Sequence, residues 1–346
     1  MTGPAGPADY FQEVHETFRR ARRSAGPGVL DMDYDIAGQV VRLCFANPVL
    51  VPILAPAFEH LRAEPMSSPA LTLCVFDLES TGAGLPPGPW PENTPATGSQ
   101  WFYDDGTLRF FNLAGESLSL FDSALGVGIY CVPSARTVPW YESGSPFRVI
   151  LHWWSGMCSR RLVHAAAVGT GSGAVLVGGK AGSGKSTTAL TCLEAGLDYL
   201  GDDYVMVSAS PSPAVYSLYS VAKLNPDNAY RFPKLKGSVS PTGNLYPAEK
   251  VLVFLARDYR ERLRPSLPLR AIIIPRLAGR RQPAVQRLSP AAALAALAPS
   301  TMFQLPGAGG AVLETMGQLV RNLPAYTLEL GPDMSGVPAL IAELVA

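Results

Sequence analysis

The chain has 346 residues, 47% of them hydrophobic and 16% charged, so it can form sizeable cores in two domains of ordinary size or in one large domain with an appendage. Its 28 lysines and arginines equal its 28 aspartates and glutamates, and this balance gives no indication of a nucleic-acid partner or an anionic membrane surface. A basic cluster between Arg257 and Arg270 is interrupted by Asp258 and Glu261, which is typical of a solvated face.

The cysteines and the first residues indicate a reducing compartment. Five cysteines lie far apart and without C-x-x-C spacing, so neither a disulfide framework nor a zinc site is indicated. Residues 1–23 lack the apolar core of a signal peptide, and no stretch approaches the apolar length that spans a bilayer. We therefore expect a cytoplasmic protein without a membrane partner. The sequence leaves open whether the chain forms a homo-oligomer.

Residues 1–145 predict an N-terminal mixed α+β sheet domain, mainly antiparallel. Residues 80–99 contain five prolines and four glycines and are expected to form a mobile surface loop. The other expected elements are a helix over 10–23, a strand over 33–45, a helix over 50–62 interrupted by two prolines, and strands over 71–76, 107–111, 117–121 and 127–132. We expect this domain to present the substrate that the second domain modifies.

Residues 146–346 predict a second domain of the α/β class. A helix is expected over 146–157, and from Arg161 onward strands alternate with helices. The later expected elements are helices over 290–298 and 309–320 and a last strand over 326–330.

The most informative motif of this domain is residues 179–186, which fit G-x-x-x-x-G-K-[ST] without a mismatch and are called the phosphate loop below. A short apolar run over 174–177 precedes the loop and is typical of a strand buried on both faces. A helix is expected over 187–195, with Gly196 at its C-terminal cap. The alternative is a glycine-rich turn with an incidental lysine, but the flanking strand and helix favour a nucleotide site.

Each residue type in the phosphate loop has a physical reason. Glycines let backbone N–H groups turn inward around phosphate oxygens, and the helix start adds free N–H groups and a positive dipole end. Lys185 places a charge at the β- and γ-phosphates, and the hydroxyl of Ser186 is a candidate Mg²⁺ ligand. The motif therefore predicts that the protein binds a nucleoside triphosphate.

Two adjacent carboxylates, Asp202 and Asp203, follow Lys185 by seventeen and eighteen residues. We expect them on the next strand, over 199–207, where neighbouring side chains point to opposite faces. Both can face the phosphates only near the strand end or at a bulge, which Gly201 favours. One carboxylate would then support Mg²⁺, and the other would accept the proton of an attacking hydroxyl. The alternative is a surface turn.

His164 is a further candidate, in an apolar run followed by three alanines. On the residues alone it is either a packed core histidine or an active-site residue. A phosphate clamp also needs cations beyond Lys185. Lys223, Lys250 and Arg276 all lie at expected strand edges, where the alternative for each is a surface charge, and we favour only Lys223 as a clamp residue.

The order and spacing of His164, the phosphate loop and the two aspartates resemble the catalytic core of the HPr kinase/phosphorylase family over residues 161–208. That resemblance implies a P-loop core related to HPr kinase and phosphoenolpyruvate carboxykinase, with ATP and Mg²⁺ as cofactors. It implies catalytic roles for His164, Lys185, Asp202 and Asp203, and metal binding by Ser186 and Asp202. The nucleotide would contact Gly179, Lys180, Ala181, Gly182, Ser183, Gly184, Lys185, Ser186 and Thr187.

The chain also departs from that family. Thr187 stands where the bacterial regulators have glutamate, Ala165 stands where they have glycine, and no counterpart of their glutamate-arginine-glycine-leucine-glycine segment follows the aspartates. The chain is more similar to stand-alone relatives, some of which phosphorylate serine on ribosomally made peptides such as lasso-peptide precursors. The resemblance therefore implies a serine kinase whose acceptor is a peptide or small protein. Two other hypotheses are a kinase for a small-molecule hydroxyl and a nucleotide-gated regulatory module with little turnover.

Overall fold

The computed structural model describes residues 6–91, 98–238, 250–279 and 281–346, which form a mixed α/β fold in two compact units. The first unit comprises residues 1–56 and 61–158, and the second comprises residues 57–60 and 159–346. Among the described residues, no helix has the length and apolar character required to cross a membrane.

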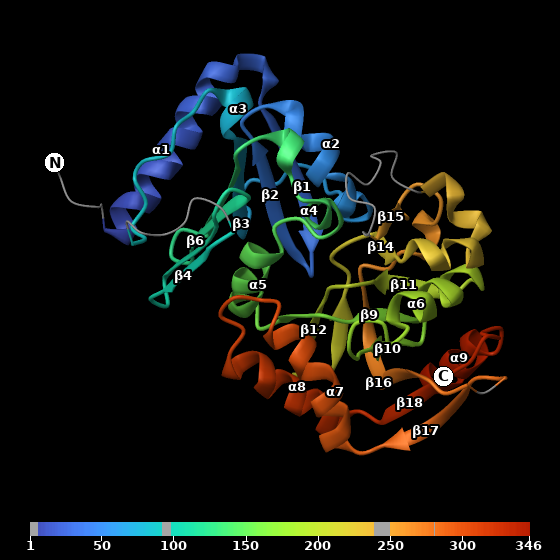
Figure 1. The fold of residues 1–346 in the computed structure, drawn as a ribbon. Coiled ribbons are helices and arrows are strands. Elements are labelled where there is room, and N and C mark those ends of the chain that lie inside the picture. Colours follow the sequence, from blue (N-terminus) through green and yellow to red (C-terminus); the bar gives the residue numbers. More distant parts are fainter. Residues whose placement is uncertain (1–5, 92–97, 239–249, 280) are drawn as a thin grey trace. The chain divides into compact units, whose positions relative to one another are not determined.

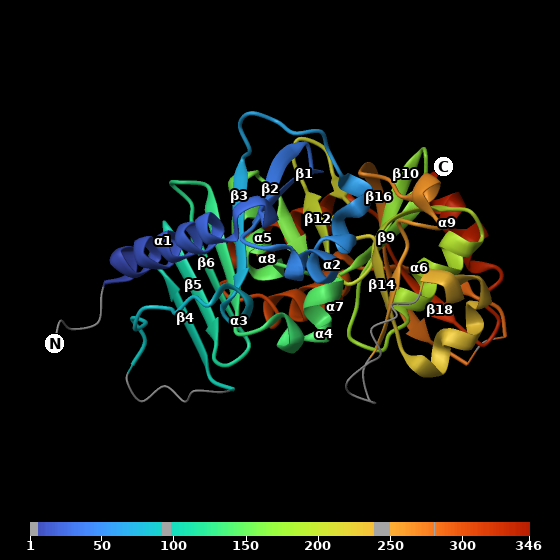
Figure 2. The same cartoon turned by 90° about the horizontal axis from the view of Figure 1, so that it is seen from above.

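The first unit contains a seven-stranded mixed sheet in the order β1-β2-β3-β7-β6-β5-β4. The long helix α1 (Pro7–Ala25) lies on one face of this sheet and buries Tyr10, Val14 and Phe18 at helical spacing (Figures 1 and 2). The strands are β1 (Leu30–Ile36), β2 (Gln39–Phe45), β3 (Leu71–Asp77), β4 (Gln100–Asp104), β5 (Leu108–Leu113), β6 (Ser117–Asp122) and β7 (Val127–Val132). The other helices are α2 (Val51–Leu54), α3 (Leu78–Thr81), α4 (Trp140–Gly144) and α5 (Arg148–Met157).

Two predicted elements of this unit are wrong in detail. The single strand expected over 33–45 is the hairpin β1–β2, because Ala37 and Gly38 form a turn with φ of 56° and 77°. The helix expected over 50–62 is only α2 followed by a 3₁₀ segment, Pro56–Leu61, since the prolines prevent one continuous α-helix. Of the expected loop over 80–99, residues 92–97 lie outside the described residues.

Helix α5 belongs to the first unit, whereas the sequence placed residues 146–157 in the second domain. Ile150 of α5 lies directly over Gly128 of β7, where a Cβ built on the glycine would be only 2.7 Å from the Ile150 Cγ2. This close contact fixes the helix on the seven-stranded sheet. The proline and tryptophan pattern predicted the helix but not the core that receives it.

The second unit contains a nine-stranded sheet covered on both faces by helices. Its main path is β11-β9-β10-β16-β13-β12-β8, and β18 pairs with both β16 and β17. Strands β14 and β15 form a separate pair. The strands are β8 (Arg161–Val163), β9 (Ala166–Thr170), β10 (Gly173–Val177), β11 (Asp198–Gly201), β12 (Val205–Ser208), β13 (Ala214–Tyr216), β14 (Val221–Leu224), β15 (Val251–Phe254), β16 (Ser266–Leu277), β17 (Ala284–Leu288) and β18 (Ala325–Leu330).

The two layers of helices explain the continuous apolar run of β10. Val175 and Val177 pack in one core with α6 (Lys185–Glu194) and α9 (Val337–Val345). Ala174 and Leu176 pack in another core with α7 (Pro290–Met302) and α8 (Gly310–Asn322) (Figure 1). The predicted burial of this strand on both faces is thus confirmed, and it holds the phosphate loop at the rigid centre of the unit.

His60 makes the stability of the second unit depend on pH. Burial, aided by Arg260, lowers the pKa of His60 to about 3, and the Nε2 atom lies 2.7 Å from the Ser217 hydroxyl. In the unfolded chain this histidine has its ordinary pKa of about 6.5. At a pH below that value, the unfolded chain therefore binds a proton that the folded unit does not. We expect acidification from pH 6.5 to 4.5 to remove about 2 kcal/mol of unfolding free energy through this residue.

This expectation is tested by thermal unfolding of the wild type and of His60→Gln at both pH values. Glutamine keeps a polar group near Ser217 but does not titrate, so the variant should lose less stability on acidification. An equal loss in both proteins would show that His60 is not the group responsible.

Candidate active site

The phosphate loop connects the end of β10 to the first residue of α6. Its three glycines, Gly179, Gly182 and Gly184, have φ of 125°, 76° and 106°, a region that side chains disfavour. A Cβ on Gly184 would also lie 2.8 Å from the Leu330 Cδ1. The loop therefore needs these glycines both for its backbone path and for its packing on β18.

Lys185 is buried inside this loop. Its Nζ donates hydrogen bonds to the carbonyl oxygens of Gly179 at 2.8 Å and Lys180 at 3.2 Å. Burial lowers the pKa of Lys185, although the carboxylates of Asp202 and Asp203 oppose this shift. The ammonium group thus lies between the loop backbone and the acidic pair, where it can contact a bound phosphate after a change of rotamer.

Asp202 and Asp203 lie in a tight turn between β11 and β12 and not on the continuous strand expected over 199–207. The pairing of β11 with β9 shifts register before Gly201, and Asp203 has a φ of 72°. The irregularity expected at Gly201 is therefore confirmed, and it allows both carboxylates to face one side. The turn is not a surface turn, because Asp202 is only 1% exposed and the side chain of Asp203 only 15%.

The carboxylate of Asp203 contacts two side chains, those of His164 and Lys223. Its Oδ1 lies 3.0 Å from the His164 Nε2, and its Oδ2 accepts a hydrogen bond from the Lys223 Nζ at 2.6 Å. Burial alone would raise the pKa of Asp203, but Lys223 and His164 together hold it well below its usual range. Asp203 is consequently ionised at neutral pH.

His164 connects the acidic pair to helix α7. It lies between β8 and β9, and its backbone N–H donates to the Thr301 Oγ1 at 2.9 Å. Its ring is 5.4 Å from that of Tyr204, whose hydroxyl donates to the Gln304 side chain at 2.7 Å. The sequence allows two interpretations of His164, a packed core residue or an active-site residue. The structure places its ring against the carboxylate of Asp203.

Asp202 has the opposite electrostatic environment. Burial, followed by repulsion from Asp203, raises its pKa, while the neighbouring Ser186 hydroxyl partly offsets this. Its Oδ2 accepts the Lys223 backbone N–H at 3.2 Å, but its Oδ1 is buried and has no hydrogen-bond partner in the described part of the chain. An unpartnered buried carboxylate oxygen beside a serine hydroxyl fits a hard divalent cation such as Mg²⁺.

These groups share one polar pocket of about 390 Å³. The pocket is lined by His164, Lys185, Ser186, Asp202 and Asp203, so it brings together every predicted catalytic and metal-binding residue. Thr187, Ala181, Gly182 and Gly184 of the predicted nucleotide contacts also line it, whereas Gly179, Lys180 and Ser183 line a second, neighbouring cavity.

Several residues of the polar pocket carry no local sequence signal. Lys223 was favoured among three cations, but its contact with Asp203 depends on the pairing of β14 with β15. Gln304 enters from the end of α7, 101 residues after Asp203, and no motif predicts it. Lys250 lines the pocket, whereas Arg276 pairs with Glu329 at 2.6 Å and does not.

The comparisons with known proteins give only a distant similarity. No protein-family model matches the chain, and no curated protein is similar to it. Among solved structures, the chain is similar to the Hpr(Ser) kinase/phosphatase from Coxiella burnetii, with 11% identity and a TM-score of 0.29 over 54% of this chain and 93% of that one. The functional conclusion therefore depends on the geometry of the pocket.

Proposed function

We propose that this chain is an ATP- and Mg²⁺-dependent kinase that transfers the γ-phosphoryl group to a serine hydroxyl of a peptide or small protein in the cytoplasm. The observation that supports this proposal is the shared pocket: Lys185 and Ser186 of the phosphate loop face the same space as Asp202 and Asp203. A binding module needs a phosphate loop, but it does not need a buried ionised carboxylate in the same pocket as that loop.

The chain's residues suit a phosphoryl transfer. The acceptor oxygen forms a bond to the γ-phosphorus while the bond from that phosphorus to the β–γ bridging oxygen breaks, and ADP leaves. The hydroxyl proton passes to Asp203, and Lys185 stabilises the negative charge of the phosphate oxygens. His164 and Lys223 hold the two Asp203 oxygens, which orients the carboxylate.

The low pKa of Asp203 is compatible with a proton acceptor. The transition state of phosphoryl transfer is loose, so little covalent chemistry is required of the protein and positioning dominates. A carboxylate that is ionised at all working pH values is always ready to orient the hydroxyl. We expect no loss of the ionised form until the solution is strongly acidic.

Ser186 and Asp202 would hold Mg²⁺ together with phosphate oxygens of the substrate. Within the described residues, no group of three or more histidine, cysteine or acidic side chains could hold a metal ion alone. Mg²⁺ is usually bound by one or two protein oxygens plus phosphate and water, and Ser186 and Asp202 would supply two such oxygens. When bound, the ion would neutralise charge on the β- and γ-phosphates.

The proposal is tested with purified protein, γ-labelled ATP and Mg²⁺, against a panel of serine, threonine and tyrosine peptides and a panel of hydroxylated metabolites. We expect label on serine peptides, verified by mass spectrometry, and no label when EDTA replaces Mg²⁺. Label only on a metabolite would favour a small-molecule kinase. Labelling of no acceptor, together with tight ATP binding, would contradict the kinase proposal and favour a regulatory module.

A further inference from the structure

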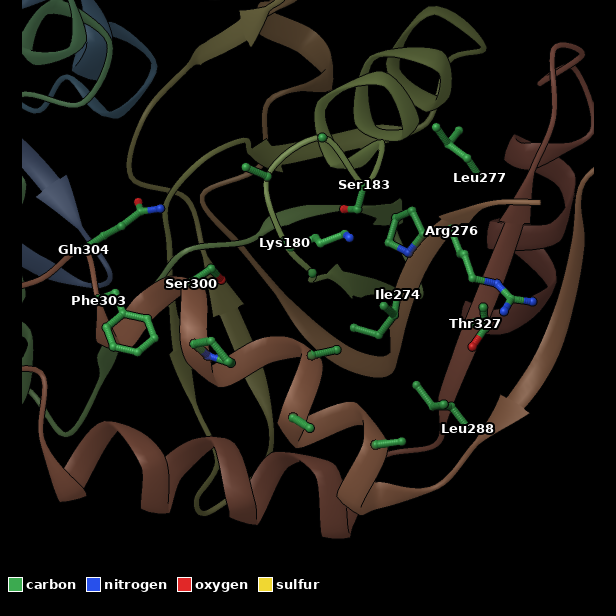
Figure 3. Close-up of a pocket in the computed structure, with 18 residues that line it drawn as sticks. Lys180, Ser183, Ile274, Arg276, Leu277, Leu288, Ser300, Phe303, Gln304 and Thr327 are labelled. Atoms are coloured by element: carbon green, nitrogen blue, oxygen red, sulfur yellow. The ribbon is translucent and has the colours of Figure 1, made fainter. Parts of the chain in front are cut away.

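A second cavity, of about 1000 Å³, lies on the other side of the phosphate loop. Figure 3 shows Lys180 and Ser183 of the loop above it, Ile274, Arg276, Leu288 and Thr327 at one end, and Phe303 and Gln304 at the other. Most of its lining is apolar, and Ala181, Gly182 and Gln304 line both this cavity and the polar pocket. The phosphoryl transfer proposed above takes place in the polar pocket and assigns no role to the apolar part of this cavity.

Three observations indicate that the apolar cavity receives a ligand. Leu277 and Phe303, which are 71% and 89% exposed, line it as large apolar side chains that no protein core covers. Helix α7 turns a face of small residues toward it, with Ala292, Ala295 and Ala296 at helical spacing. Ser183, which is only 8% exposed, is among the lining residues, and its buried Oγ has no hydrogen-bond partner among the described residues.

The lining residues of the two pockets differ in chemistry, and each set suits a different part of a nucleotide. The acceptor hydroxyl must reach Asp203, which lines only the polar pocket. The apolar cavity has no aspartate or glutamate in its described lining, so it offers no carboxylate to a hydroxyl proton. A flat ring with two apolar faces fits between the small-residue face of α7 and the end of β16. The volume of the cavity is also typical of a pocket for a drug-sized ligand.

We propose that the apolar cavity binds the nucleoside of the phosphate donor, with the base between α7 and the β16–β18 edge and the triphosphate on the loop. This inference rests on the proposed function. Ser183 supplies a polar contact at the boundary between the two parts. Phe303 lies at the mouth of the cavity, and its aromatic ring stacks on the base there.

The test compares ATP with inorganic tripolyphosphate, which keeps the phosphates and lacks the nucleoside. Dissociation constants for both are measured by calorimetry on the wild type, on Ala295→Trp, which fills the cavity, and on Phe303→Ala, which opens it. Both changes are at exposed positions, and thermal unfolding checks that each variant is folded. Leu313→Ala is the matched control, since Leu313 is a half-exposed apolar residue on α8 that does not line the cavity.

We expect both cavity variants to weaken ATP binding by about tenfold to a hundredfold without changing tripolyphosphate binding, because Phe303→Ala removes one base–aromatic contact and Ala295→Trp occupies the space of the base. The Leu313→Ala control should change neither. Unchanged ATP binding, or equal weakening of both ligands, would overturn the assignment of the cavity but leave the kinase proposal intact. A wild-type protein that binds neither ligand would overturn both.

Discussion

Replacement of Lys185 by alanine is expected to reduce phosphoryl transfer by about 10³-fold and to weaken ATP binding at the same time. The reason is the position of the ammonium group, which is buried within the loop and shares the polar pocket with two carboxylates. Without it, the developing charge on the γ-phosphate loses the cation that the phosphate loop holds in this pocket. Steady-state labelling and calorimetric titration with ATP measure the two effects.

Lys180→Ala is the matched control for this variant. Lys180 lies in the same loop, but its side chain is exposed and lines only the apolar cavity. At saturating ATP the control should keep most of the transfer activity, because its side chain does not line the polar pocket in which the transfer would occur. Equal losses in the two variants would indicate a general disturbance of the loop and contradict a specific role for the Lys185 charge.

The second large effect is expected for Asp203→Asn, which should reduce transfer by about 10²- to 10⁴-fold while ATP still binds. Asparagine keeps the shape of the side chain but cannot accept the hydroxyl proton. The change also leaves the buried ammonium of Lys223 without its carboxylate, and we expect a loss of about 3 kcal/mol of unfolding free energy. Labelling rates and thermal unfolding measure the two quantities separately.

Two further variants separate catalysis from stability. The double variant Asp203→Asn/Lys223→Met removes both charges of the buried ion pair, so it should regain stability without regaining activity. Asp227→Asn changes an exposed carboxylate near the pocket and should alter neither property. If Asp203→Asn retained nearly full activity, or if the double variant regained it, Asp203 would not be the proton acceptor.

Local signals in the sequence were sufficient for the centre of the site. The phosphate loop, the buried strand before it and the helix after it follow from eight residues and their apolar neighbours, because glycine, lysine and serine each have one physical use in that pattern. The structure adds that α6 begins at Lys185, two residues before its predicted start. Gly201 correctly indicated the irregularity that turns both aspartates to one side.

What the sequence could not supply depends on contacts between distant segments. The turn at Asp202 and Asp203 is bounded by two strands with different partners, β9 and β8, and no local pattern distinguishes this from one continuous strand. The contact of Lys223 with Asp203, and the position of Gln304 at the pocket, arise from tertiary packing alone. The hairpin at Ala37 and Gly38 was missed for a different reason: its two-residue turn interrupts a stretch whose residues otherwise alternate as in one strand.

The most direct test of the account is a crystal structure of the protein with a non-hydrolysable ATP analogue and Mg²⁺. The account predicts a γ-phosphorus within reach of both the Lys185 Nζ and the Asp203 carboxylate, and a metal ion bound by Ser186 and Asp202. A triphosphate that extends away from Asp202 and Asp203, with its γ-phosphate outside the polar pocket, would contradict it.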